Sequence, residues 1–338
     1  IPYKAKYDNF IGGKWVAPVK GEYFDVITPI TGKPYTKAAR SSAEDIELAL
    51  DAAHAAADKW AKTAPGERAN LLLKIADRLE ANLELLATAE TIDNGKPIRE
   101  TLNADIPLAI DHFRYFAGCM RAQEGSLSEI DDSMVAYHFH EPIGVVGQII
   151  PWNFPILMAA WKLAPAVVAG NCVVLKPAEF TPISILILME TIADILPPGV
   201  INIVNGYGRD VGAPLANSRR IGKIAFTGST AVGKIIMKAI AGTPKKASME
   251  LGGKAANIIF EDAALDQAVE GIVNGIFFNQ GHVCCAGSRL YVQESVYGKV
   301  VQKLKDRMQA LNIGDPMDKN TDIGAINSKK QLTTIQKY

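Results

Sequence analysis

The sequence is poor in cysteine and has no excess of charge of either sign. Only four of its 338 residues are cysteine, and 36 basic side chains balance 36 acidic ones. This balance argues against nucleic acid or an anionic membrane as the main partner. No apolar run is long enough to span a bilayer, and the first ten residues do not resemble a signal peptide. We therefore expect a cytoplasmic protein with neither nucleic acid nor membrane as a partner.

The four cysteines do not form a disulfide framework or a zinc pattern. Cys119 and Cys172 lie far apart, and the neighbours Cys284 and Cys285 could bridge only with strain. The sequence has no Cys-x-x-Cys pair of the kind that binds zinc, and we expect no metal site. Reduced thiols in a cytosolic protein are the simplest interpretation, with Cys119 and Cys172 as small core residues. The adjacent pair needs a separate explanation.

The patterns of apolar residues indicate an α/β protein. Alternating polar and apolar residues predict an exposed hairpin within 125–141. From Ile143 onward, short apolar runs that fit buried strands recur with helix-like segments between them. The runs are IGVVGQII, NCVVL, VINIV, KIAF and ANIIF. The expected helices cover 41–60, 65–91, 97–120, 156–169, 183–196 and 232–241. Strands that alternate with helices form a parallel sheet, which binds ligands beyond the carboxyl ends of its strands.

Three segments that follow these strands carry distinctive motifs. PWNFP follows the first strand. TGSTAVGK resembles a phosphate-binding loop from Gly228 to Lys234, but Ile235 replaces the Ser or Thr that magnesium requires. ATP or GTP hydrolysis is therefore not expected, whereas the N–H groups of a following helix could still bind a phosphate. In KPAE, Lys176 and Glu179 could bind ribose hydroxyls or form a solvated surface pair.

Two further motifs contain groups suited to acid–base and nucleophilic chemistry. Glu250 precedes two glycines, where a partly desolvated carboxylate could act as a general base, although an ordinary solvated Glu also fits the pattern. Cys284 and Cys285 follow a helix-like segment in a glycine-rich loop, which is a typical setting for a reactive thiol. His282 is the only histidine nearby, so a Cys–His hydrolase is the rival mechanism.

In order along the chain, PWNFP, KPAE, FTGSTAVG, MELGGK and NQGHVCCAGSR resemble the motifs of the aldehyde dehydrogenase superfamily. The resemblance runs from near Phe10 to the last residue, and five separated motifs in the same order make it specific. YHFHEPIGVVGQIIPWNFP looks closest to bacterial NAD-dependent members that oxidise short aliphatic aldehydes such as acetaldehyde. The resemblance implies NAD(P)+-dependent oxidation of an aldehyde to the carboxylic acid, through a thiohemiacetal and a thioester on cysteine.

The resemblance also implies a role for each matching residue. Cys284 would be the nucleophile, Glu250 the base that activates water, and Asn153 an oxyanion donor together with the Cys284 N–H. The cofactor contacts would be Ile149, Trp152, Lys176, Glu179, Gly228, Ser229, Gly233 and Leu251. Glu179 would favour NAD over NADP, because its carboxylate binds both ribose hydroxyls and repels a 2′-phosphate. Lys162 matches a lysine near the active site of the family.

The implied architecture has a Rossmann-like parallel-sheet domain, an α/β catalytic domain and a bridging β-hairpin. The NAD-binding domain would comprise residues 1–124 and 142–249, and the hairpin 125–141. Residues 250–338 would form the N-terminal part of the catalytic domain. Polar and apolar residues alternate along the hairpin, which is expected to be exposed and could offer an edge to a second subunit. We therefore expect a homodimer or homotetramer.

The sequence departs from the family pattern at three places. His282 replaces the usual Gln or Glu, and Ala255 and Ala256 replace the usual Ser-Pro. The chain ends at QKY inside a helix-like segment, before the family's Glu-x-Phe-Gly-Pro motif, so we expect a C-terminally incomplete chain with weak turnover. Two alternatives remain: a CoA-acylating dehydrogenase, against which Glu250 argues, and an inactive scaffold, against which the intact Cys284, Glu250 and Asn153 argue.

Overall fold

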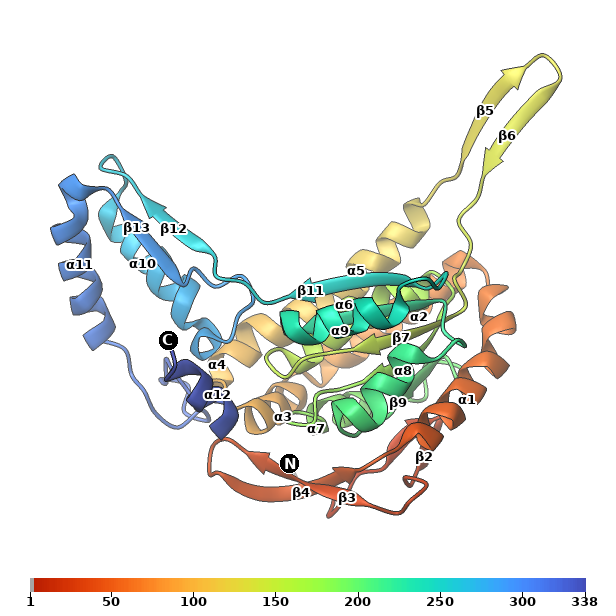
Figure 1. Cartoon of the computed structure of the whole chain (residues 1–338), viewed down its shortest axis with the longest axis horizontal. Coiled ribbons are helices and arrows are strands. Elements are labelled where there is room, and N and C mark those ends of the chain that lie inside the picture. Colours follow the sequence, from red (N-terminus) through yellow and green to blue (C-terminus); the bar gives the residue numbers. More distant parts are fainter. Residues whose placement is uncertain (1–2) are drawn as a thin grey trace.

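A seven-stranded sheet lies at the centre of the computed structural model, which describes residues 3–338 (Figure 1). Its order is β11-β10-β7-β8-β9-β1-β2. The strands are β1 Asn9–Ile11, β2 Lys14–Val16, β7 Val145–Ile149, β8 Cys172–Lys176, β9 Ile201–Ile203, β10 Lys223–Gly228 and β11 Lys246–Leu251. The five from β7 to β11 are parallel, which confirms the predicted Rossmann-like sheet. Residues 1 and 2, where the predicted first domain begins, lie outside the described residues.

The order of connections in the sheet reverses between β7 and β10. From β7 the chain continues to β8 and β9 on one side, then returns to form β10 and β11 on the other side. Doubly wound sheets of this kind bind their ligands beyond the carboxyl ends of the strands at such a reversal. The ends of β7 and β10 therefore mark the place where a nucleotide is expected.

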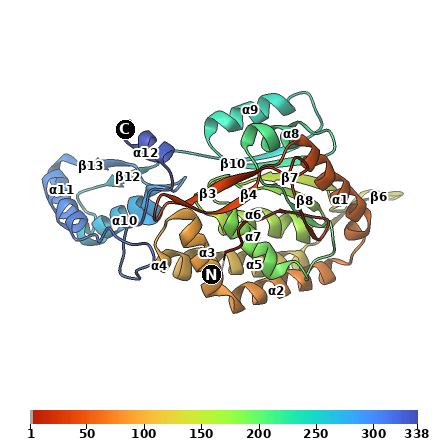
Figure 2. The same ribbon diagram turned by 90° about the horizontal axis from the view of Figure 1, so that it is seen from below.

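Helices cover both faces of the sheet (Figure 2). On one face lie α6 Pro155–Val168 and α7 Ile183–Ile192, with α2 Pro65–Ala81, α3 Leu83–Asn94, α4 Ile98–Glu100 and α5 Ile106–Ala122 outside them. On the other face lie α1 Ala43–Ala61, α8 Ala213–Asn217 and α9 Thr230–Ile240. Within residues 3–338, every helix is too short or too polar to cross a membrane.

Three of the predicted helices are divided or shortened in the structure. The one predicted over 97–120 begins with α4, passes through a π-helical turn at Thr101–Asp105 and continues as α5. The segment predicted as one helix over 65–91 is two helices, because Asn82 leaves the helical conformation (φ −117°, ψ 23°) between α2 and α3. Asn favours such breaks, since its side chain competes for backbone hydrogen bonds. The helix predicted over 183–196 ends at Ile192, ahead of Pro197 and Pro198, which cannot continue a helix.

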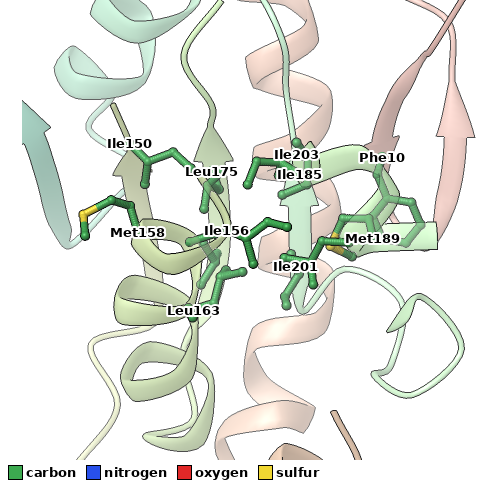
Figure 3. Close-up of a cluster of buried hydrophobic side chains, with 14 of the residues drawn as sticks. Phe10, Ile150, Ile156, Met158, Leu163, Leu175, Ile185, Met189, Ile201 and Ile203 are labelled. Atoms are coloured by element: carbon green, nitrogen blue, oxygen red, sulfur yellow. The ribbon is translucent and has the colours of Figure 1, made fainter. Parts of the chain in front are cut away.

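The main hydrophobic core lies between the sheet and helices α6 and α7 (Figure 3). Ile156 and Leu163 from α6 pack there with Leu175 from β8 and Ile201 from β9, and all four are buried. Full burial of one such side chain stabilises the fold by about 1.5–3 kcal/mol. The packing fixes the sheet and hence the positions of its strand ends.

The predicted exposed hairpin is present and extends away from the body of the molecule (Figure 1). Its strands β5 (Ser126–Asp131) and β6 (Met134–His138) pair antiparallel. Several large apolar side chains on it are exposed: Leu127, Ile130, Met134, Val135 and Tyr137. A second hairpin, β3 (Tyr23–Thr28) with β4 (Lys33–Ala39), lies near the N-terminal strands.

A smaller unit follows β11 and has a core of its own. Its strands β12 (Ala256–Ile259) and β13 (Arg289–Val292) pair in parallel, so the predicted strand ANIIF belongs to this second sheet and not to the central one. Helices α10 (Leu265–Phe277) and α11 (Glu294–Gln309) pack on it, and α12 (Lys329–Ile335) lies near the C-terminus. Its buried core consists of Ile259, Ile272, Val296 and Val300. The domain boundaries at 124, 142 and 249 stay a prediction.

Candidate active site

The carboxyl ends of four parallel strands bring five of the predicted site residues to one edge of the sheet. Ile149 at the end of β7 is paired with Lys176 of β8 and with Phe226 of β10. Gly228 at the end of β10 is opposite Leu251 of β11, and the preceding pair includes Glu250. This strand-end edge, which we define by Ile149, Lys176, Gly228, Glu250 and Leu251, follows from the register of the sheet alone.

Helix α9 begins directly at this edge and presents its N-terminus there. Ser229 caps the helix, because its hydroxyl oxygen accepts a hydrogen bond from the Val232 N–H at 3.3 Å. Gly233 in the first turn lies against β11, where a Cβ atom would stand 2.6 Å from Leu251 Cδ2. The absence of a side chain at Gly233 therefore lets α9 approach the sheet closely. Unpaired N–H groups at a helix start and the helix dipole favour a bound phosphate.

Lys176 and Glu179 form a polar pair at the end of β8. The Lys176 Nζ is buried and donates to Pro177 O at 2.8 Å and to Glu179 Oε2 at 3.2 Å. Burial lowers the pKa of Lys176, and the Glu179 carboxylate opposes this shift. Glu179 itself is partly exposed. The pair is thus anchored at its lysine and open to solvent at its carboxylate, which is the solvated end a ribose could reach.

The loop between β7 and α6, residues 150–154, carries Trp152 and Asn153 and is fixed by α3. The Asn94 side-chain amide donates to Trp152 O at 2.7 Å, and the Ile156 N–H donates to Glu90 Oε2 at 3.0 Å. The Asn94 amide donor and the Glu90 carboxylate acceptor both lie in the C-terminal part of α3. The position of Asn153 therefore depends on side chains about sixty residues earlier in the chain.

The loop of residues 278–286, which we call the nucleophile loop, carries Cys284 and starts in an unusual backbone conformation. Asn279, Gln280 and Gly281 all have positive φ, at 49°, 54° and 75°. Glycine adopts this region freely, whereas glutamine does so at a cost of about 1–2 kcal/mol. Backbone strain of this kind persists only where surrounding contacts impose it. The contacts here come from Glu100, from Asn153 and from Gly324, whose N–H donates to Gln280 Oε1 at 3.2 Å.

Asn153 lies against the nucleophile loop, as a role beside Cys284 requires. Its Nδ2 donates to His282 O at 2.8 Å, and its own carbonyl oxygen accepts from Asn279 Nδ2 at 2.6 Å. A side-chain amide carries two hydrogens, so one remains for a ligand. Its participation in an oxyanion site together with the Cys284 N–H stays a prediction.

The two cysteines of the loop differ in their surroundings from the buried Cys172. Both Cys284 and Cys285 are exposed and free. Partial burial and the neighbouring Cys285 raise the pKa of the Cys284 thiol, which favours its protonated form. A Cβ atom on Gly253 would stand 3.4 Å from Cys284 O, so the segment after Glu250 runs beside the nucleophile loop.

Glu250 is the nearest carboxylate in sequence to Gly253, which lies beside the nucleophile loop. It lies close enough to Lys162 to affect it: burial lowers the pKa of Lys162 to about 8, and the Glu250 charge opposes the shift. The role of Glu250 as a general base stays a prediction.

His282 is a buried neutral side chain and not a partner of the thiol. Its ring packs edge-on against Trp152 with ring centroids 4.9 Å apart. Burial and the positive charge of Lys96 lower the pKa of His282 to about 4. In the described part of the chain, neither ring nitrogen has a hydrogen-bond partner. The rival Cys–His mechanism therefore lacks its ion pair in this structure.

A buried ionic cluster beneath both loops is the feature that sequence reasoning missed. Lys96 Nζ lies 2.5 Å from Asp105 Oδ2 and 3.5 Å from Glu90 Oε1, and it stands 4.1 Å above the Phe154 ring. Glu100 is also buried and belongs to this cluster through the charges of Lys96 and Asp105. The only sequence signal is a run of charged residues in a segment otherwise patterned as helix. Among the described residues, no group of three His, Cys, Asp or Glu side chains could hold a metal ion.

Comparison with known proteins gives one consistent family. Residues 15–338 match the model described as "Aldehyde dehydrogenase family". A long-chain-aldehyde dehydrogenase of Acinetobacter sp is 61% identical and an acetaldehyde dehydrogenase 2 of Cupriavidus necator is 59% identical; the alignments cover 99% and 100% of this chain and 68% of each relative. The NAD+ complex of an aldehyde dehydrogenase from Bacillus cereus is 40% identical with a TM-score of 0.96, over 98% of this chain and 68% of that one. The chain thus spans about two thirds of the length of these relatives.

Proposed function

The chain belongs to the aldehyde dehydrogenase family of oxidoreductases, and from this premise we propose that it oxidises a short aliphatic aldehyde to the carboxylic acid with NAD+. The observation that carries the proposal is the 2.8 Å hydrogen bond from Asn153 Nδ2 to His282 O. It joins the loop after β7 to the loop that carries Cys284. This contact supports a single site formed by the strand-end edge and the exposed thiol.

The residues at the strand-end edge fit a dinucleotide. The N-terminus of α9, capped by Ser229 beside Gly228 and close to β11 at Gly233, would hold the pyrophosphate. Lys176 and Glu179 would bind the adenosine ribose, and Ile149, Trp152 and Leu251 would line the cleft. The open carboxylate of Glu179 supports NAD over NADP, because a 2′-phosphate would meet a negative charge. When bound, NAD+ would supply the acceptor for the hydride.

The protein's own groups would act in sequence on the aldehyde. After a base has taken its proton, the Cys284 sulfur bonds to the aldehyde carbon and the carbonyl π electrons move to oxygen. The oxyanion is stabilised by Asn153 Nδ2 and the Cys284 N–H, where each such donor contributes about 10²–10³ in rate. Loss of hydride from this adduct leaves a thioester on Cys284. Glu250 then takes a proton from water, whose hydroxide displaces the thiolate and releases the acid.

The raised pKa of the Cys284 thiol supports a need for a base in the first step as well as the last. Lys162 lies near Glu250, and its pKa is lowered to about 8. The Glu250 carboxylate opposes that shift, which places the two side chains close enough to influence each other. The free state of all four cysteines supports a reducing, cytoplasmic location.

The proposed enzyme would work as a homodimer or homotetramer through the β5–β6 hairpin. Its exposed apolar side chains include Leu127, Ile130 and Tyr137. A patch of this kind on an extended hairpin is suited to pairing with a second subunit. Domain boundaries at 124, 142 and 249 would then separate the nucleotide-binding, subunit-pairing and catalytic parts.

NADH formation from NAD+ and acetaldehyde tests the proposal, with Cys284→Ala and Cys285→Ala as a matched pair. We expect the Cys285→Ala variant to keep activity and the Cys284→Ala variant to lose it, because only Cys284 bonds to substrate. Equal activity of both variants would contradict the assigned nucleophile. A rate that depends on added CoA would favour the CoA-acylating alternative. Repeating the assay with a long-chain aldehyde distinguishes the two substrate classes named among the relatives.

A further inference from the structure

Glu100 makes a contact with the nucleophile loop that the proposed chemistry does not use. Its two carboxylate oxygens accept the Asn279 N–H at 3.0 Å and 3.2 Å. Glu100 lies at the end of α4, 179 residues before Asn279 in the chain. Both residues are buried, so the bond is formed out of water. A hydrogen bond in such a place is costly to lose, because the buried N–H would be left without an acceptor.

The Asn279 N–H needs an external acceptor because the local backbone cannot supply one. Asn279 has φ 49° and ψ 40°, which places it outside the helix that ends before it. Gln280 and Gly281 continue with positive φ, so the chain reverses its course in this segment. A buried N–H without a partner is costly, so the carboxylate stabilises this conformation against helical alternatives.

The same residue connects Glu100 to the rest of the site. The Asn279 side chain donates to Asn153 O at 2.6 Å, and Asn153 Nδ2 donates to His282 O, two residues before Cys284. Thus Glu100 fixes Asn279, Asn279 contacts Asn153, and Asn153 holds the segment that carries the thiol. None of these contacts touches the sulfur itself.

A cavity of about 300 Å³ borders Glu100. It is lined by Glu100, Phe277 and Phe278, together with Arg99 and Asn103 from the same segment as Glu100. Phe278, at the start of the nucleophile loop, borders this open space on one side and packs against Phe154 on another. Loss of the Glu100 contact would therefore leave the loop room to relax.

We propose that Glu100 is a positioning residue: through the Asn279 N–H it holds the nucleophile loop in the conformation that places Cys284 beside Asn153. The inference rests on the proposed function only in giving Cys284 its role. The hydrogen bond requires both the reach of a glutamate side chain and an acceptor oxygen. It does not require the negative charge, which distinguishes positioning from a purely electrostatic role.

Hydrogen–deuterium exchange of the Asn279 amide in the full chain tests the contact directly, with Glu100→Asp and Glu100→Gln as a matched pair. Glu100→Asp keeps the charge but shortens the reach, and we expect about tenfold faster exchange at Asn279. Glu100→Gln keeps reach and acceptor, and we expect exchange within about threefold of the unmodified chain. The reverse order, or no change in Glu100→Asp, would overturn the proposal.

Asp45→Asn controls for the loss of a buried carboxylate elsewhere. Asp45 accepts the Val19 N–H at 2.9 Å at the start of α1, a helix that forms no hydrogen bond with the nucleophile loop within residues 3–338. We expect it to leave Asn279 exchange unchanged, and a rise equal to that of Glu100→Asp would overturn the specific contact.

Steady-state NADH formation supplies a second readout, which separates this inference from the proposed function. We expect Glu100→Asp to lower kcat about tenfold with the KM for NAD+ unchanged, and Glu100→Gln to restore it. A changed KM with normal kcat would contradict a role at the thiol. If the unmodified chain forms no NADH, the proposed function fails, and the exchange result still decides the Glu100 contact.

Discussion

The strand-end edge and the nucleophile loop are fixed by different kinds of contact. At the edge, main-chain pairing alone sets Ile149 opposite Lys176 and Gly228 opposite Leu251. The nucleophile loop is instead held by side chains that bond to its main chain, from Glu100 and from Asn153. The edge therefore gains its precision from the hydrophobic core behind it, whereas the loop depends on a few buried polar groups.

This difference predicts that the two regions respond differently to the loss of a single side chain. A register of many backbone hydrogen bonds tolerates the loss of one side chain, because its neighbours keep the strands in place. A loop held by a buried ionic cluster is sensitive to each member, since removal of one leaves charges without partners. Substitutions in the two regions can measure how far this contrast holds.

The largest effect is expected for Lys96→Met. The substitution removes the only cation within the cluster and leaves Glu90, Asp105 and Glu100 without it. We expect a loss of about 3–5 kcal/mol in the free energy of unfolding, measured by urea denaturation. Lys62→Met is the matched control, because Lys62 and its partner Asp58 are exposed and no measurable change is expected. Equal stability of both variants would show that the cluster does not support the loops.

A smaller effect is expected from pH. Burial raises the pKa of Glu100 to about 7, with the charge of Asp105 adding to the shift and Lys96 opposing it. Burial also raises the pKa of Glu90, and Lys96, which lies closer to Asp105 than to Glu90, opposes this shift only in part. A carboxyl group with a raised pKa binds its proton more tightly when folded. Its stabilising contribution is therefore complete below the unfolded pKa and is lost as the pH rises through the folded pKa.

We accordingly expect the free energy of unfolding to fall by about 1–3 kcal/mol between pH 5 and pH 8. Urea midpoints across this range measure the slope. In Glu100→Gln, which cannot titrate at this position, the decline should be shallower. A stability that rises with pH through the same window would show that these carboxylates are ionised in the folded protein at low pH.

The smallest effect is expected at the strand-end edge, for Ser229→Ala. The Ser229 hydroxyl caps α9 through the Val232 N–H, and loss of such a cap costs about 1 kcal/mol. Thr230→Ala, at the adjacent exposed position, is the matched control and should leave stability unchanged. Calorimetric binding of NAD+ to both variants would show whether the cap also supports the phosphate. A loss as large as that of Lys96→Met would remove the contrast between the two regions.

The sequence predicted the edge well, because its residues follow buried strands whose ends must meet in a parallel sheet. TGSTAVGK and KPAE could be placed from that rule alone. The nucleophile loop was predicted only as a glycine-rich segment with a reactive thiol. Its conformation depends on contacts across more than 120 residues, from Asn153 and Glu100, which no local pattern encodes. The helix break at Asn82 was not predicted, because the helical spacing of apolar residues continues through it.

The most direct test of the central claim, that Cys284 is acylated within this site, is peptide mass spectrometry of the chain after mixing with acetaldehyde and NAD+. Glu250→Gln should slow hydrolysis of the thioester, so that the acyl group accumulates. The account predicts an acetyl group on Cys284 and none on Cys285, formed only when both acetaldehyde and NAD+ are present. Acetylation of Cys285, or no acyl group on either cysteine in a folded chain that binds NAD+, would contradict it.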